Sequence, residues 1–162
     1  MKRFVSRSLL GFLGLLVTPC MTHPAQQTLQ QEYRTDPRRV RLKRFFAARK
    51  APAEGLAADF LAAADHHNLD WRLLPSLSVI ESGGGKHCKF GWDSGEHKFL
   101  SLRHGIHFVA RRLTQSKLYR GKPLDEKLGQ YNPYPDYPSR VKLVIRMLGP
   151  AELAVDSATD QA

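Results

Sequence analysis

Apolar residues recur at helical rather than strand spacing over most of the chain. Residues 53–67, for example, place Leu56, Phe60 and Ala64 on one face of a helix. A period near 3.6 residues is typical of amphipathic helices that bury one side. The same spacing predicts helices over residues 37–50, 53–67, 71–82, 102–113, 124–130 and 139–148.

Capping residues mark several of these helix ends. Asp36 precedes Pro37, which is the usual order of an N-cap and a first helical residue. Asp70 and Ser101 are predicted to cap the third and fourth helices in the same way. Pro52 ends the first helix, because proline cannot donate the next backbone hydrogen bond.

One stretch interrupts the helical pattern. Residues 83–100 are rich in glycine and polar residues, and they predict an irregular loop or a short hairpin around Ser94 and Gly95. The expected fold class is therefore all-α, with five or six helices and this one loop.

The two ends of the chain differ from its middle. Residues 1–25 combine a basic start with a nine-residue apolar stretch, which is typical of a secretory signal peptide, with an uncleaved N-terminal anchor as the alternative. Residues 26–36 are polar and predict a linker, and residues 150–162 predict a disordered tail. One globular domain is expected between them, over residues 37–149.

The formal net charge of +10 narrows the choice of partner. Such a charge suits either nucleic acid or the anionic polymers of a cell envelope. The predicted leader favours the envelope, because an exported chain does not meet genomic DNA. We therefore expect an exported protein of the periplasm or cell envelope, with no nucleic-acid partner, and with membrane association through the N-terminus if the anchor is kept.

Histidines raise the question of a metal ion. His66 and His67 are adjacent, and adjacent side chains on a helix diverge rather than meet at one ion. His104 and His107 are three residues apart, but no acid or thiol accompanies them in the sequence. No metal site and no cofactor is expected.

Glu81 is the residue whose position most suggests chemistry. It follows Leu77 and Ile80 at helical spacing, so its carboxyl lies beside the apolar stripe, in the last turn of the helix. Burial and the negative end of the helix dipole both raise a carboxyl pKa, which suits a general acid for glycosidic cleavage. Three glycines come directly after Ser82, and they would leave room for a bulky polymer. The alternative is an ordinary acid at a helix end, bonded to Ser82 or to loop N–H groups.

Four ordered blocks carry a family resemblance: LLPSLSVIESGGGK, FGWDSG, KFLSLRHGIHFVARRL and YNPYPDYPSRVKLVIRML. Together they resemble the bacterial glucosaminidase family of autolysins and flagellar peptidoglycan hydrolases, within the lysozyme-like superfamily. The resemblance covers about residues 56–148. It implies a lysozyme-like helical domain and a glycosidase that acts on peptidoglycan glycan strands, and we expect this protein to be a monomer.

The resemblance also implies roles for individual residues. Glu81 takes the place of the catalytic acid, and Tyr131 that of a cleft tyrosine that orients substrate or steadies the developing oxocarbenium charge. Aromatic side chains in the two loops beside the cleft suit sugar rings, which stack on flat apolar faces. The expected substrate-binding set is Ser82, Phe90, Gly91, Trp92, Tyr134 and Tyr137.

The reaction type stays open at this point, because the second carboxylate is uncertain. Asp93 and Glu96 are the nearest candidates, in a loop that is shorter than the family's usual one. A hydrolase uses two carboxylates, and their separation decides whether a water or a covalent intermediate is involved. A lytic transglycosylase needs one acid and leaves an anhydro-muramic end. A non-catalytic peptidoglycan-binding module is the third alternative.

Overall fold

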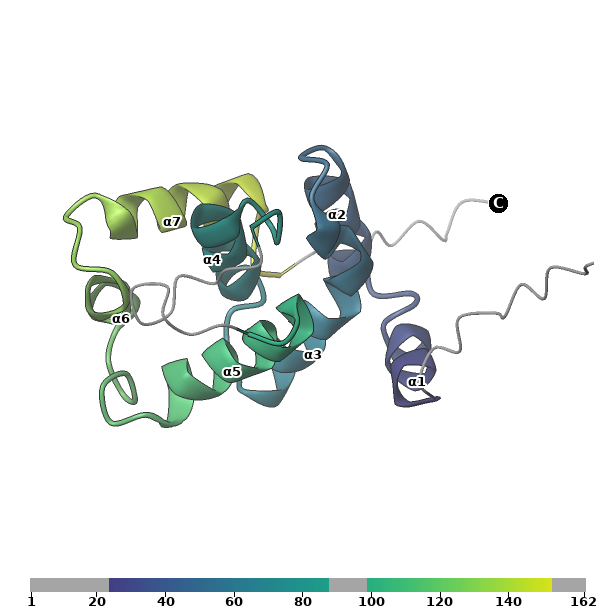
Figure 1. The fold of residues 1–162 in the computed structure, drawn as a ribbon, viewed down its shortest axis with the longest axis horizontal. Coiled ribbons are helices and arrows are strands. Elements are labelled where there is room, and N and C mark those ends of the chain that lie inside the picture. The colour runs from purple at the N-terminus through teal and green to yellow at the C-terminus, as the bar shows by residue number, and fades with distance from the viewer. Residues whose placement is uncertain (1–23, 88–98, 153–162) are drawn as a thin grey trace, which may run out of the picture.

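The computed structural model describes residues 24–87 and 99–152, and within these ranges all regular structure is helical (Figure 1). The all-α class expected from the sequence is thus confirmed for the described part of the chain. None of the helices in these ranges is long and apolar enough to span a bilayer. The elements are α1 (Pro24–Glu32), α2 (Pro37–Ala47), the 3-10 helix η1 (Pro52–Leu56), α3 (Ala57–His66), α4 (Leu73–Ser82), α5 (Leu102–Gln115), α6 (Leu124–Tyr131) and α7 (Tyr137–Met147).

Two of the three predicted N-caps are confirmed. The Asp36 side chain accepts a hydrogen bond from the Arg38 backbone N–H at 2.8 Å. The Ser101 hydroxyl accepts one from the His104 N–H at 3.1 Å. Asp70 accepts from the Arg72 N–H at 2.9 Å, but α4 begins only at Leu73, so Asp70 closes the turn before the helix instead of capping it.

Most of the segment predicted as a linker, residues 26–36, is helical. Helix α1 reaches Glu32, and Tyr33 then packs against the core and donates a hydrogen bond to Asp65 at 3.0 Å. This segment has too few apolar residues to show helical periodicity in the sequence. Only the structure, in which α1 contacts α3, shows that it is a helix. At the other end, the Trp71 indole N–H donates to the Ala151 carbonyl at 2.8 Å, which holds the first residues of the predicted tail. The predicted hairpin around Ser94 lies outside the described residues.

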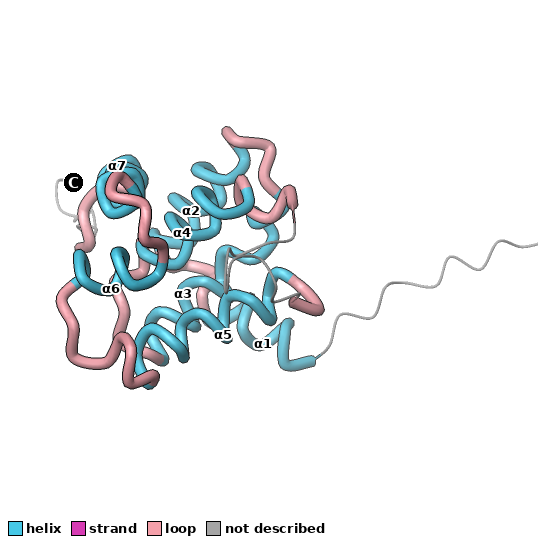
Figure 2. The backbone as a smooth tube through the Cα atoms, turned by 60° about the vertical axis from the view of Figure 1, so that its left-hand side comes forward, coloured by secondary structure: helices cyan, strands magenta, loops and turns pink. Residues whose placement is uncertain are grey.

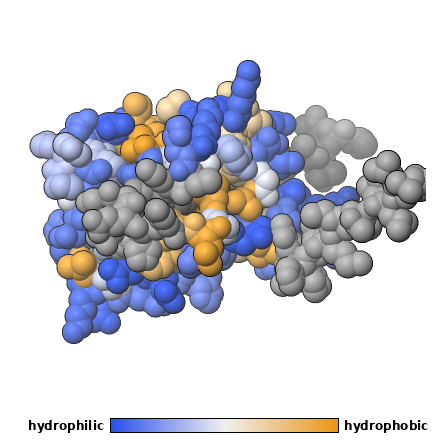
Figure 3. All heavy atoms as spheres, in the orientation of Figure 1, coloured by the Kyte–Doolittle hydropathy of each residue, from blue (hydrophilic) through white to orange (hydrophobic). Residues whose placement is uncertain are grey.

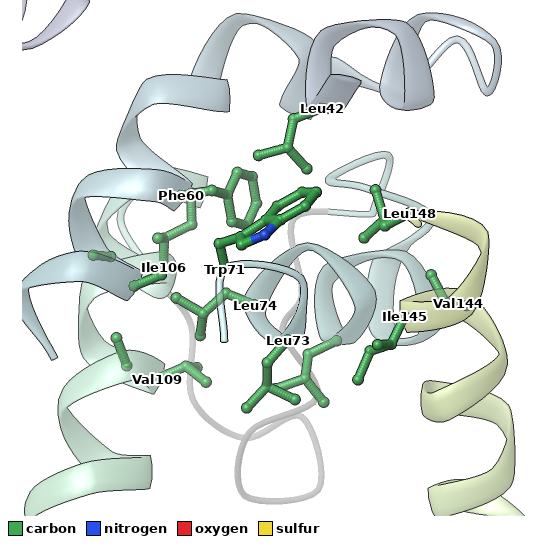
Figure 4. Close-up of a cluster of buried hydrophobic side chains, with 14 of the residues drawn as sticks. Leu42, Phe60, Trp71, Leu73, Leu74, Ile106, Val109, Val144, Ile145 and Leu148 are labelled. Carbon is green, nitrogen blue, oxygen red and sulfur yellow. The ribbon is translucent and has the colours of Figure 1, made fainter. Parts of the chain in front are cut away.

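Helix α4 lies at the centre of the described structure (Figure 2). It contacts α3, α5 and α7, and most of its residues are buried. Large apolar side chains from α2, α3, α4 and α5 converge around it, joined by Leu148 just beyond α7 (Figure 4). Burying one such side chain stabilises the fold by about 1.5–3 kcal/mol. Those fully buried in this cluster include Leu42, Phe60, Leu74, Ile106 and Leu148.

An ion pair between the buried Asp59 and the half-exposed Arg103 joins α3 to α5. The Asp59 carboxylate is almost completely buried, and the Arg103 guanidinium binds both of its oxygens through Nε and Nη2. Removing one partner of such a pair leaves an uncompensated charge in a medium that solvates it poorly. The pair therefore fixes the relative position of two helices of the core.

We predict that Arg103→Met lowers the free energy of unfolding by about 3 kcal/mol, because Asp59 then stays buried without its partner. Lys142→Met is the matched control. Lys142 binds Asp125 at 2.8 Å in an exposed pair, and its loss should cost less than about 1 kcal/mol. Urea denaturation at neutral pH measures both, and equal losses would contradict the structural role of the pair between Asp59 and Arg103.

Candidate active site

Glu81 lies near the end of the central helix, where the chain reaches the surface. The last turn of α4 closes through two backbone bonds, from the Gly83 N–H to the Val79 carbonyl at 2.9 Å and from the Gly84 N–H to the Ser78 carbonyl at 3.0 Å. Glu81 itself is half-buried. Its carboxyl therefore lies between the apolar interior and water.

The glycines after Glu81 serve packing rather than clearing space for a polymer. Gly84 and Gly85 have φ angles of 74° and 93°, which L side chains rarely adopt. A Cβ at Gly84 would lie 2.7 Å from the Ala51 Cβ, and one at Gly85 would lie 2.6 Å from Leu102 Cδ2. The room that the sequence suggested for substrate at these two positions is thus filled by the protein itself.

Ser82 is a structural neighbour of the acid. Its side chain is 1% exposed. The hydroxyl donates to the Ser78 carbonyl at 2.9 Å and accepts from the Gly85 N–H at 3.0 Å. Because both bonds are internal, Ser82 holds the turn behind Glu81, which fits the structural neighbour of the acid that the resemblance implies better than its place in the substrate-binding set.

The closest partner of Glu81 is Tyr137, the first residue of α7. Its hydroxyl donates a hydrogen bond to Glu81 Oε1 at 2.5 Å, within the range of strong charge-assisted bonds. The Tyr137 side chain is only 1% exposed. A ring so deeply buried cannot stack on a sugar, so Tyr137 positions the acid and is not the substrate contact that the sequence predicted.

Tyr131 lies against Tyr137. The two rings are nearly parallel, at 11°, with centroids 6.0 Å apart. Burial and the nearby charge of Glu81 raise the pKa of both phenols well above the usual range, so both stay neutral at any physiological pH. The pair forms an aromatic layer beside the carboxyl.

The pKa of Glu81 is raised above its ordinary value, and burial is the main cause. The hydrogen bond from Tyr137 and the positive charge of Arg140 act in the opposite direction, because both favour the ionised form. Arg140 lies on α7 one turn after Tyr137 and is exposed. The direction of this shift agrees with the prediction from the sequence.

The other predicted site residues are the exposed Tyr134 and several that lie beyond the described ranges. Tyr134 lies in the connection between α6 and α7, with 70% of its side chain exposed and its backbone N–H bonded to Asn132 Oδ1 at 3.1 Å. Within the described ranges, no three acidic, histidine or cysteine side chains are grouped so that they could hold a metal ion. The remaining candidates lie outside the described residues: Phe90, Gly91, Trp92, Asp93 and Glu96.

Sequence reasoning missed two features of this site. It did not foresee that Tyr137 contacts Glu81, and it gave no role to Arg140. The pattern does hold one signal, because Tyr137 and Arg140 are three residues apart and so lie on neighbouring parts of one helix face. What the pattern lacks is any sign that this face packs against the end of α4.

Comparison with known proteins identifies no relative of this chain. No protein-family model, curated protein or solved structure matches the chain.

We predict that Glu81→Gln stabilises the folded protein at neutral pH. Because the pKa of Glu81 is higher in the folded protein, the charged form of Glu81 opposes folding. Its contribution to the free energy of unfolding is most favourable below the ordinary pKa of 4.5, where Glu81 is protonated. That contribution is lost as the pH rises through the pKa of the folded state. Glutamine is neutral throughout and can still accept the Tyr137 hydrogen bond. Thermal unfolding should show a higher melting temperature for the variant at about pH 7, and a difference that shrinks toward about pH 4.

The control is Glu126→Gln, on the exposed surface of α6, which should change the melting temperature little at either pH. A Glu81→Gln variant that is less stable than the parent at neutral pH would contradict the prediction.

Proposed function

We propose that this chain is a glycosidase with a lysozyme-like helical fold that cleaves the β-1,4-linked glycan strands of peptidoglycan, as an endo-β-N-acetylglucosaminidase. The observation that carries the proposal is the half-buried carboxyl of Glu81, with its raised pKa and its 2.5 Å bond from Tyr137. General-acid cleavage of a glycosidic bond needs a carboxyl that keeps its proton near neutral pH and lies at the surface.

The bond from Tyr137 also selects which oxygen of Glu81 carries the proton. Because Tyr137 donates to Oε1, that oxygen acts as an acceptor and the acidic proton belongs on Oε2. Oε2 would then protonate the glycosidic oxygen as the bond to the leaving sugar breaks. The carboxylate that forms is stabilised by the same phenol and by the charge of Arg140, so both interactions strengthen as the reaction proceeds.

The aromatic layer gives the two tyrosines different tasks. Tyr137 positions Glu81 from inside the protein. Tyr131 stacks on it at the end of α6, close enough to Glu81 to feel its charge, and takes the proposed role of orienting the sugar or steadying the oxocarbenium charge. The net charge of +10 supports an anionic polymer as substrate. The predicted leader, residues 1–25, supports export to the periplasm or cell envelope.

A lytic transglycosylase is the second candidate, favoured by the composition of the described site. The groups around Glu81 within the described ranges are two phenols and a guanidinium, and the candidate second carboxylates Asp93 and Glu96 lie outside those ranges. One acid suffices for this reaction: it protonates the leaving oxygen and then accepts a proton from a hydroxyl of the sugar, which closes an anhydro ring.

We expect Glu81→Gln to slow the digestion of purified peptidoglycan sacculi by roughly a hundredfold or more, because glutamine cannot donate the acidic proton. Release of soluble fragments measures the rate, and Glu126→Gln should digest at the parent rate. Mass spectrometry of the released fragments separates the candidates: reducing N-acetylglucosamine ends indicate a glucosaminidase, and anhydro-muramic ends a transglycosylase. If the parent binds sacculi without releasing fragments, the protein is a binding module.

We expect Tyr137→Phe to lower the rate by about 10- to 100-fold, because Glu81 loses its positioning bond and the support of its carboxylate. That bond lowers the pKa of Glu81, so its removal raises the pKa further. The alkaline limb of the pH–rate profile should therefore move to higher pH. Glu126→Gln, on the exposed surface of α6, should change neither the rate nor the limb. A rate loss with an unmoved limb would mean that Tyr137 acts only through folding.

A further inference from the structure

The outward face of α7 combines apolar and cationic side chains. Leu143 and Met147 are 52% and 56% exposed, although residues of their type are usually buried. Arg140 and Arg146 lie three residues before and after Leu143, so they flank it on the same exposed face. The opposite face packs into the core through Tyr137, Val141, Val144 and Ile145.

Cations outnumber acids around this face. Neither α7 nor α2 contains an acidic residue, and the acids beside α7 include Asp136, which directly precedes it, and Asp125, which binds Lys142 at 2.8 Å. The edge of α2 reaches the end of α7, where Arg41 Nη1 donates to the Leu148 carbonyl at 3.3 Å and Arg49 Nη2 lies 3.9 Å from Met147 Sδ. Hydrophobic and hydrophilic atoms adjoin along this upper side of the molecule, over α7 (Figure 3).

We propose that the outward face of α7 docks on the surface of an anionic lipid bilayer. Arginine side chains at such a surface attract anionic headgroups, while their stems extend so that the charge stays in the headgroup layer. Leu143 and Met147 lie between these arginines on the same face. On docking, their side chains move from water into the boundary between the headgroups and the acyl chains. This is the arrangement of an interfacial helix.

Charge complementarity separates the bilayer from other occupants. A second copy of the chain would bring two cationic faces together, which like charges oppose. A soluble polyanion would bind the arginines but would offer nothing to the two apolar side chains. A bilayer with anionic lipids satisfies both groups at once.

Most of the docking face lies on a different side of α7 from the candidate active site, and Arg140 lies at the border between them, because its charge also acts on Glu81. Tyr137 faces α4 and Glu81, whereas Leu143 faces away from the core. Docking therefore leaves the bond between Tyr137 and Glu81 in place. The inference does not rest on the proposed function and can be tested without any measurement of activity.

The test compares variants of the full chain for co-sedimentation with phosphatidylglycerol-containing vesicles and with vesicles of phosphatidylcholine alone. We expect binding to the anionic vesicles only, weakened by salt. Arg140→Gln and Arg146→Gln should each weaken it about fivefold, and Leu143→Ser about tenfold. Matched controls lie between α5 and α6, on the side away from α7 in Figures 1 and 2: Leu118→Ser and Arg120→Gln should bind as the parent does.

A second measurement detects insertion directly. Leu143→Trp should shift its fluorescence to shorter wavelength when anionic vesicles are added, and Leu118→Trp should not. If the arginine variants lose binding while Leu143→Ser and Leu143→Trp behave as their controls do, the face binds negative charge alone, as it would on a soluble polyanion. The proposal is then wrong. It is equally wrong if the control variants lose as much binding as the α7 variants.

Discussion

The packing of α4 against α7 is the contact on which the rest of the structure depends. It buries the apolar residues of both helices, and it also brings the Tyr137 hydroxyl to Glu81. A single interface thus supplies stability and arranges the polar groups of the site. A shift of α7 along α4 by one residue would disturb both, so the site has the rigidity of the core rather than that of a surface loop.

This arrangement disfavours the ionised form of Glu81. A carboxyl that is half-buried at the end of a helix is less stable when charged, and one hydrogen bond and one nearby arginine offset the cost only in part. The glycines behind it let the chain turn closely against Ala51 and Leu102, so this part of the site is held by close packing. The proposed role as a general acid would account for a carboxyl in this unfavourable position.

The features that sequence reasoning predicted are those with local causes. The caps at Asp36 and Ser101 depend on residues two or three positions away, and the helices themselves on apolar spacing. Helix α1 escaped prediction because Tyr33, not an apolar stripe, ties that segment to the core. The bond from Tyr137 to Glu81 joins residues 56 positions apart, and no local pattern records such a contact. The sequence therefore pointed to Glu81 but not to the side chain that donates a hydrogen bond to it.

The connection between α6 and α7 carries a consequence for how this protein can change in evolution. Tyr131 ends α6 and Tyr137 begins α7, and their rings are nearly parallel across the short segment that joins them. One residue inserted directly after Tyr137 would turn the later residues of α7 by about 100° relative to the phenol. The helix could then no longer bury its apolar face and keep the phenol on the acid. Functional relatives should therefore keep the spacing between Tyr137 and the buried residues of α7, whereas the exposed positions of the connection between α5 and α6 tolerate added residues.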